Sequence, residues 1–323
     1  MPRTLAVILN YNGAVNTGSS YLQCIDSLIN QSVKTGILII DNHSSDNSIE
    51  TIRSQFPHID IIVNKTNMGT AGYNTGIEYF TCHDYDYMLL SNNDMVYRND
   101  FIEYMTESMA ELNNAAVLTP LMLMKDRKTV NSTGIIMNRS GYAWDRDFGR
   151  NVRDIDRPPG EVIFATGGAM FLDRSAANAA GLFDPLYFAY YEDNDYCMTV
   201  RLKTGRRIYF IPNAVCYHDF SASWSRKQKE KDYLLNRNRF IFVLKFFPLK
   251  HMFNALRHLY FTKHISGMRG RIIFDLFSKL PMIIVRRLKY MKYSKEFPHE
   301  LMEDYHGMPR MQFAVSNKES LEE

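Results

Sequence analysis

The chain has 323 residues, of which 46% are hydrophobic and 23% charged, which excludes a disordered protein and suits a large α/β domain with a smaller part. The net charge of +3 is uneven: residues 226–295 hold 18 Lys and Arg against 3 Asp and Glu, so they carry +15 and the rest −12. No signal-peptide pattern and no apolar run of about 18 residues is present, so we expect neither a secretory signal nor a transmembrane helix. The four cysteines form no CxxC pair, which argues against a zinc site or disulfide framework.

Strand and helix signals alternate along the first part of the chain. Short apolar runs predict strands at residues 4–10, 36–42, 59–64, 85–94 and 115–123. Helical spacing and capping residues predict helices at residues 21–29, 44–56, 70–80 and 101–112. This alternation, in units of about 25–30 residues, indicates a parallel sheet with helices on both faces.

Polar side chains follow four of these strands at their carboxyl ends. They are Asn10 and Asn12, Asp41 and Asn42, Asn64 and Asn67, and finally Asn92, Asn93 and Asp94. Ligands of parallel sheets bind beyond the carboxyl ends of the strands. Asn and Asp are also common in turns, but four such ends on one edge favour a polar ligand site.

The fourth strand ends in SNND, residues 91–94, which is a candidate metal site. Mg²⁺ and Mn²⁺ prefer oxygen ligands and complete their coordination with water and substrate phosphates. Asp94 and Asn92 would lie on the same side of the strand and supply such oxygens. The tetrapeptide alone also fits an ordinary turn, and His218 becomes a candidate ligand only if the fold brings it beside Asp94.

The middle of the chain loses the alternation. Residues 124–160 are polar and rich in turn signals, so we expect a loop over the site. Residues 161–173 predict a strand interrupted by Gly167 and Gly168, which indicates either a close backbone or ligand approach or a bulge.

Three acids follow an aromatic segment at residues 187–191 and precede a helix expected at residues 195–203. They are Glu192, Asp193 and Asp195. Carboxylates beside aromatic walls can have raised pKa values and act as general bases. Alternatively, Asp193 or Asp195 caps the helix, which we expect to end at Gly205.

Beyond residue 225, apolar clusters alternate with Lys and Arg, which predicts helices with one apolar and one basic face. Such helices lie on anionic membrane surfaces. The alternative is a helical subdomain whose basic surface is incidental. No nucleic-acid motif accompanies the charge, so we expect no nucleic-acid partner.

Several blocks together resemble glycosyltransferase family 2, especially its rhamnosyltransferase-like members. They are NYNG (10–13), IIDNHSSDNS (39–48), NMGTAGYNTGI (67–77), SNND (91–94), TGGAMFLDR (166–174) and the stretch 191–223. The resemblance implies a GT-A fold, an α/β class with a Rossmann-like mixed sheet and helices on both faces. We expect this domain at residues 1–225, with a helical, basic extension at residues 226–323.

The resemblance also implies an activity: inverting transfer of a sugar from a nucleoside diphosphate donor with Mn²⁺ or Mg²⁺. Rhamnose from a deoxythymidine diphosphate donor is the sugar that it suggests. The acceptor would be a glycan or lipid-linked saccharide in cell-surface polysaccharide synthesis. With the basic extension, we expect a cytoplasmic protein that binds the inner face of the membrane peripherally.

Site residues follow from the same resemblance. Asp41 would contact the nucleobase, and Asp94 would hold the metal, with His218 completing the metal site. Asp193 of the Glu192-Asp193 pair would be the catalytic base. The donor pocket would be formed by Asn10, Asn12, Asn42, Asn67, Gly69, Gly72, Asn74, Asn92 and Asn93.

Two other functions are alternatives to this activity. Asn92 stands where the family's metal motif has its first acid, which leaves open a non-catalytic sugar-nucleotide-binding or scaffold protein at the membrane. The intact Glu192-Asp193 pair argues against that protein class. A nicotinamide-dependent dehydrogenase is excluded because no GxGxxG follows the first strand.

Overall fold

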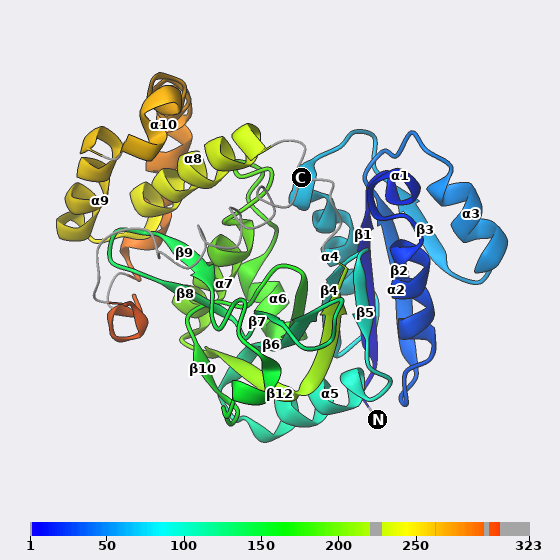
Figure 1. Cartoon of the computed structure of the whole chain (residues 1–323). Coiled ribbons are helices and arrows are strands. Elements are labelled where there is room, and N and C mark those ends of the chain that lie inside the picture. Colours follow the sequence, from blue (N-terminus) through cyan, green and yellow to red (C-terminus); the bar gives the residue numbers. More distant parts are fainter. Residues whose placement is uncertain (1, 220–227, 262, 294–296, 304–323) are drawn as a thin grey trace.

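The computed structural model describes residues 2–219, 228–261, 263–293 and 297–303 (Figure 1). In this part of the chain a ten-stranded sheet has the order β10-β12-β6-β11-β4-β1-β2-β3, with β5 paired to β12 and β7 to β6. The strands are β1 (Thr4–Asn10), β2 (Thr35–Asp41), β3 (Asp60–Val63), β4 (Tyr87–Asn92), β5 (Met95–Tyr97), β6 (Ala115–Met124), β7 (Val130–Ser132), β10 (Gly160–Val162), β11 (Ala169–Asp173) and β12 (Arg207–His218). β1 to β4 are parallel, whereas β11 runs antiparallel to β4 and β6, so the predicted mixed sheet is confirmed.

Helices cover both faces of the sheet, as the alternating sequence predicts. The helices are α1 (Gly13–Thr17), α2 (Ser20–Ile29), α3 (Ser48–Gln55), α4 (Tyr73–Cys82), α5 (Phe101–Glu111), α6 (Arg174–Ala180), α7 (Glu192–Thr204), α8 (Gln228–Phe246), α9 (Leu249–Phe261) and α10 (Arg269–Met291), with short 3-10 turns η1 (Gly69–Gly72), η2 (Val152–Asp154), η4 (Lys263–Met268) and η6 (His299–Leu301). Along β1, Leu5 and Val7 join the apolar cluster under α4, α6, α7 and α8. Ala6 and Ile8 join the cluster under α2, α3 and α5, because successive strand side chains point to opposite faces.

The strand register brings the predicted polar ends together. In the parallel pairs of β1, Asn10 lies opposite Asp41 and Leu9 lies opposite Asn92. β3 pairs with β2 so that Val63, one residue before Asn64, lies opposite Asp41. All four strands therefore end at one edge of the sheet, as expected for a ligand site.

The structure corrects two expectations for the middle of the chain. Residues 124–160 are not a loop: they contain β7, η2 and a hairpin of β8 (Ile135–Met137) and β9 (Ala143–Asp145). Val130 and Met137 are buried in the main apolar cluster, which explains this order. Residues 161–173 are not one strand, because β10 pairs with β12 at the sheet edge while β11 lies between β4 and β6.

Helix α7 also begins earlier than expected. It starts at Glu192 and not at Asp195, so all three acids lie in its first turn. Tyr191 precedes the helix with a left-handed backbone (φ 69°), and no side chain caps it, so neither Asp193 nor Asp195 is a helix cap. Gly205, with φ 67°, ends the helix as predicted.

The C-terminal part is helical, as expected, and α8 is closely integrated with the sheet domain. Phe240 and Phe242 of α8 are fully buried in the same apolar cluster as α7. The proposed domain boundary after residue 225 stays a prediction, since residues 220–227 lie outside the described residues. None of the described helices is long and apolar enough to cross a bilayer.

Candidate functional site

Asp41, at the end of β2, is buried and is the centre of a hydrogen-bond network across three strand ends. Asn10 Nδ2 donates to Asp41 Oδ1 at 2.9 Å, and the Ser44 backbone N–H donates to Asp41 Oδ2 at 2.9 Å. Asn10 Oδ1 in turn accepts from Asn93 Nδ2 at 2.8 Å. The Ser44 hydroxyl accepts from the Asn12 backbone N–H at 2.8 Å. Asn10, Asn12, Asp41 and Asn93 therefore form one cluster.

Asn42 organises the segment that precedes α4. Its Nδ2 donates to Asn67 Oδ1 at 2.9 Å and to the Gly69 carbonyl at 2.8 Å. Gly69 has φ 61°, and a Cβ there would lie 2.0 Å from the Phe188 carbonyl oxygen. A Cβ on Gly72 would lie 2.8 Å from Asn42 Oδ1. Glycine is therefore required at both positions, because the backbone passes against neighbouring groups.

Asp94 and His218 are brought together because β5 pairs with β12, with His218 opposite Met95. His218 Nε2 lies 3.3 Å from Asp94 Oδ2, and His218 Nδ1 donates to Asn131 Oδ1 at 2.7 Å. Asp94 Oδ1 is buried without a hydrogen-bond partner among the described residues. A buried, unpaired carboxylate oxygen beside an imidazole nitrogen fits a divalent cation.

This pair makes an incomplete metal site by itself. Within the described residues, no three His, Cys, Asp or Glu side chains group closely enough to hold an ion. Asp219 follows His218, but its carboxylate is paired with Lys125 at 2.7 Å and with Ser20. A bound ion would need further oxygens from water and diphosphate, as Mg²⁺ sites commonly do.

Asp193 lies in the first turn of α7 and is held by two backbone N–H groups. Gly167 donates to Oδ2 at 3.0 Å and Asn194 donates to Oδ1 at 2.8 Å. Burial raises the pKa of Asp193 to about 6, opposed by these hydrogen bonds. Burial, and then the charge of Asp193, hold the pKa of Glu192 well above its ordinary value. Near neutral pH Asp193 is therefore the ionised member of the pair and can accept a proton.

Gly167 and Gly168 connect Asp193 with the end of β4 at Asn92. Besides the Gly167 bond to Asp193, the Gly168 carbonyl accepts from the Asn92 backbone N–H at 3.0 Å. A Cβ on Gly167 would lie 3.2 Å from the Asp193 Cβ, and one on Gly168 would lie 3.0 Å from Met122 Cε. Of the two readings of the double glycine, the close backbone approach is the one observed.

One expected donor residue does not join the cluster. Asn74 Nδ2 donates to the Phe183 carbonyl at 3.1 Å, and Asn74 Oδ1 accepts from the Phe183 backbone N–H at 2.7 Å. Its amide is thus committed to fixing the chain before α7. By contrast, Asn92 remains at the strand end, where Oδ1 accepts from the Tyr73 hydroxyl at 3.1 Å.

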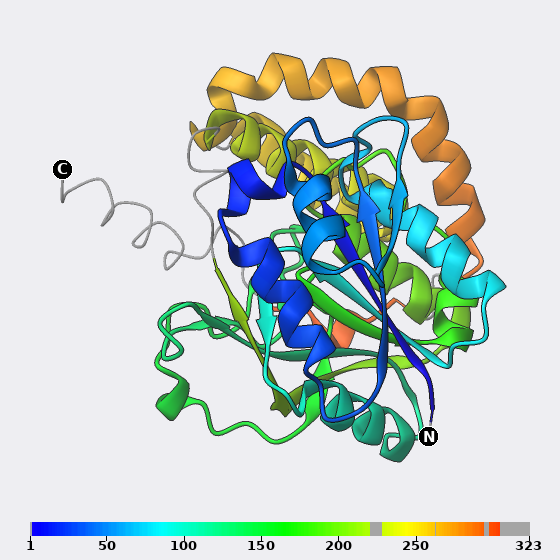
Figure 2. The same ribbon diagram turned by 90° about the vertical axis from the view of Figure 1, so that its right-hand side faces the viewer.

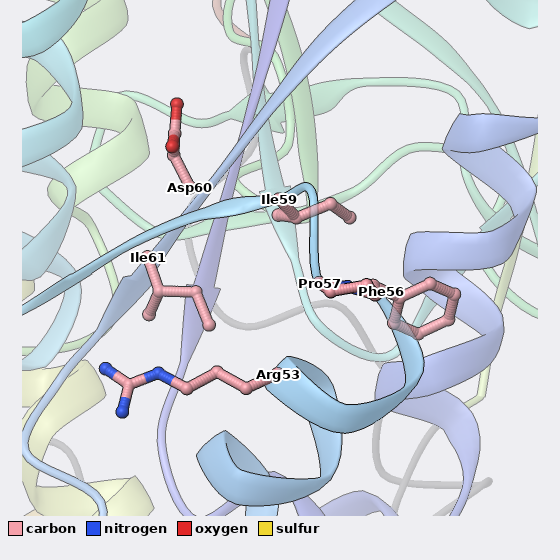
Figure 3. A pocket seen from close by; sticks show the side chains of 6 residues that line it. All are labelled: Arg53, Phe56, Pro57, Ile59, Asp60 and Ile61. Carbon is pink, nitrogen blue, oxygen red and sulfur yellow. The ribbon is translucent and has the colours of Figure 1, made fainter.

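A separate pocket of about 370 Å³ lies at the edge strand β3 (Figure 3). Arg53, Phe56, Pro57, Ile59, Asp60 and Ile61 line it. Asp60 begins β3 and pairs with Leu38 in the middle of β2, so it lies at the opposite end of β3 from Val63, which pairs with Asp41. The pocket therefore lies away from the polar strand ends.

Sequence reasoning missed Asp145 and Asn131. Asp145, on β9, adds to the effect of burial in raising the pKa of Asp193, and to the effect of Asp94 in raising the pKa of His218. Both residues fall in the region expected to be a loop, and no motif distinguishes them. Only the strand pairing in space, of β7 with β6 and of β9 with β8, reveals them.

The third acid of α7 has a different partner. Lys245 of α8 donates to Asp195 at 2.7 and 2.9 Å and to Asp184 at 3.0 Å, and all three side chains are buried. Arg286 of α10 also pairs with Asp184, at 2.5 Å from the oxygen that accepts from Lys245. Asp195 is therefore committed to an ion pair, unlike Asp193.

The chain matches the family model described as glycosyl transferase family 2 over residues 6–181. No curated protein matches the sequence. Among solved structures, GalNAc-T7 with UDP, GalNAc and Mn²⁺ matches with a TM-score of 0.61 and 13% identity over 90% of this chain, which spans only 58% of that protein.

Two further structures match over most of both chains. S. aureus TarS 1-349 in complex with UDP-GlcNAc has a TM-score of 0.56 at 14% identity, covering 95% of this chain and 94% of that one. The mannosyltransferase PcManGT from Pyrobaculum calidifontis, in complex with GDP-Man and Mn²⁺, has a TM-score of 0.51 at 11% identity, covering 99% and 80%. At these identities the likeness shows the fold alone, and it confirms the GT-A architecture.

We predict that Lys245→Met lowers the free energy of unfolding by about 3–5 kcal/mol, because it leaves the Asp195 carboxylate buried without an opposing charge. Denaturant titration measures this loss. Lys250→Met makes the same change at an exposed position and should alter stability by less than about 0.5 kcal/mol. Equal stability of the two variants would contradict the prediction.

Proposed function

The chain belongs to glycosyltransferase family 2, and we propose that it is an inverting, metal-dependent enzyme that transfers a sugar from a nucleoside diphosphate to a hydroxyl group. The observation that carries this proposal is Asp193. It is a half-buried carboxylate whose pKa is raised to about 6, and it is linked through Gly167 and Gly168 to the end of β4, next to Asp94. Direct displacement at a sugar carbon needs a base and a diphosphate site close together, and both would lie at this edge of the sheet.

In the proposed reaction Asp193 accepts the proton of the acceptor hydroxyl. The hydroxyl oxygen then bonds to the anomeric carbon on the face opposite the diphosphate. The bond to the diphosphate oxygen breaks, its electron pair stays with the phosphate, and the anomeric centre is inverted. Glu192, protonated beside Asp193, keeps a second negative charge away from the base.

Asp94 and His218 would hold the metal ion, Mn²⁺ or Mg²⁺. A bound ion would neutralise negative charge on the diphosphate. The partnerless Asp94 Oδ1 supports this assignment, and Asn131 holds the His218 ring so that Nε2 faces Asp94. Asn92 offers an amide oxygen at a position where a second carboxylate would bind the metal ion more strongly.

The residues of the two hydrogen-bond networks around Asp41 and Asn42 would line the donor pocket. Asp41 would accept from a nucleobase N–H, and the segment Asn67–Gly72 would line the diphosphate and sugar. The sequence blocks support rhamnose as the sugar and a deoxythymidine diphosphate carrier. A glycan or lipid-linked saccharide would be the acceptor, in cell-surface polysaccharide synthesis.

We also propose that α10 places the enzyme on an anionic membrane surface, as a cytoplasmic, peripheral protein. Figure 2 shows α10 as a long helix over the top of the molecule. Its exposed apolar residues are Phe274, Phe277, Met282, Ile284, Val285, Leu288 and Met291. The same helix carries Arg269, Arg271, Lys279, Arg286, Arg287 and Lys289 against a single acid, Asp275. This combination suits a helix lying in the headgroup region.

The transferase is tested by offering dTDP-rhamnose, UDP-GlcNAc and GDP-mannose and following release of the nucleoside diphosphate. We expect Asp193→Asn to slow release by about 10²–10⁴-fold with donor affinity kept, because the base is lost. In the unmodified enzyme the rate should fall about tenfold per pH unit below about 6, as Asp193 becomes protonated. Asp60→Asn, an exposed acid at the opposite strand end, should behave like the unmodified enzyme.

The outcomes distinguish the two functions. Donor binding by calorimetry without turnover of any donor, with acceptor extracts supplied, would favour the non-catalytic protein. Normal turnover of Asp193→Asn would remove Asp193 as the base.

Metal binding is tested by titrating Mn²⁺ and following its electron paramagnetic resonance signal. Asp94→Asn should weaken Mn²⁺ binding in the presence of donor by at least about tenfold, because a charged ligand is lost. Asn92→Asp should strengthen it, because a second carboxylate is added. Unchanged affinity in both variants would place the ion elsewhere.

Membrane binding is tested with the full chain and vesicles of phosphatidylglycerol or phosphatidylcholine. We expect binding to phosphatidylglycerol that weakens with salt, and a loss of about tenfold or more for Phe274→Glu with Phe277→Glu. Their side chains are 73% and 71% exposed. Ile29→Glu, at an exposed apolar position on α2, is the control. Equal binding by all variants would exclude α10 as the contact.

A further inference from the structure

We propose that Asn238 of α8 is a positioning residue for the reaction: it holds the loop of residues 186–191 in the conformation that presents Glu192 and Asp193 to the substrate. This inference rests on the proposed transferase function. It assigns to the C-terminal helices a part in the active site, distinct from any contact with a membrane.

The loop before α7 has a strained backbone. Phe188, Tyr190 and Tyr191 have φ values of 65°, 66° and 69°, a left-handed conformation that non-glycine residues seldom adopt. Such residues persist only where their surroundings impose the conformation, and they gather at functional sites. Here they come directly before the two acids.

Asn238 supplies the constraint from one side. Its Nδ2 lies 3.0 Å from the Tyr187 carbonyl, 2.7 Å from that of Ala189 and 2.8 Å from that of Tyr190. The side chain is fully buried, and its Oδ1 accepts from Arg237 Nε at 2.9 Å. All the hydrogen-bonding capacity of this amide is therefore directed at the loop or at the neighbouring arginine.

Arg237 extends the same contact. Its Nη2 donates to the Leu186 carbonyl at 3.2 Å and to the Tyr187 carbonyl at 2.8 Å. Together Asn238 and Arg237 reach four of the six carbonyls between residues 186 and 191. These carbonyls accept from side chains of α8 that are themselves buried, so losing a donor there leaves a backbone carbonyl without that partner.

The donor segment holds the loop from the opposite side. The Phe188 carbonyl accepts from the Thr70 backbone N–H at 2.8 Å and from the Thr70 hydroxyl at 3.1 Å. Gly69 lies against the same carbonyl, where no side chain would fit. The loop is thus fixed between α8 and the proposed donor segment, and any shift would move the acids relative to the donor.

The first measurement is amide hydrogen exchange of the full chain, read on peptides covering residues 184–195. Asn238→Ala should speed exchange in this segment by at least about tenfold, because the Ala189 and Tyr190 carbonyls lose their side-chain donor and the Tyr187 carbonyl keeps only Arg237 and the Ala189 N–H. Asn236→Ala is the matched control, because it removes a buried amide from the same helix. Among the described residues, that amide bonds to the Asp232 carbonyl, at 2.8 Å, and not to the loop. If Asn238→Ala does not fold, Asn238→Ser, which keeps one donor, replaces it.

The second measurement uses whichever donor the unmodified enzyme turns over. We expect Asn238→Ala to lower kcat about tenfold or more while the donor Kd changes less than about twofold. Asn236→Ala should change neither. A general loss of folding would instead move both constants together with the thermal midpoint.

The outcomes separate the two proposals. Loop exchange as slow as in the control, or fast exchange with normal kcat, would overturn the role of Asn238. Fast loop exchange in Asn238→Ala, together with no turnover of any donor by the unmodified enzyme, would support the contact of Asn238 with the loop and count against the transferase function.

Discussion

The backbone of Gly167 and Gly168 passes between two parts of the site and bonds to both. One amide donates to the Asp193 carboxylate and the next carbonyl accepts from Asn92. A side chain at either position would press on Asp193 or on Met122. The spacing between the turn after β4, which carries Asp94, and the helix that carries Asp193 is therefore set through the backbone of these two glycines. Main-chain contact is stiffer than contact between long side chains.

Much of the fold follows from local signals. Five of the six strands between residues 4 and 124 and the four longer helices between them were predictable, because their apolar residues repeat with the period of the element that they form. The short elements β5 and α1 carry no such signal. The clustering of Asn10, Asp41, Asn42 and Asn92 follows from parallel pairing alone. These features follow from local sequence patterns and from the rule that the carboxyl ends of parallel strands lie at one edge of the sheet.

What could not be predicted depends on contacts between distant residues. Asp145 and Asn131 reach the site through short strands whose three residues carry no periodic signal. The resemblance placed the base on Asp193, but only the structure shows that Asp195 is paired with Lys245, fifty positions later. Asn74 looked like a donor ligand, but its amide fits the Phe183 backbone. In each case the partner in space, and not the residue type, decides the role.

The hydrogen bonds from α8 to the loop before Asp193 also bear on how the protein is made. Residues 186–191 leave the ribosome about fifty positions ahead of the asparagine and arginine that complete their bonding. Domains generally begin folding from the N-terminal side during synthesis. The sheet can therefore assemble first, whereas the strained loop lacks its partners until α8 has emerged. The proposed base, Asp193, would therefore reach its final position only after α8 has been synthesised.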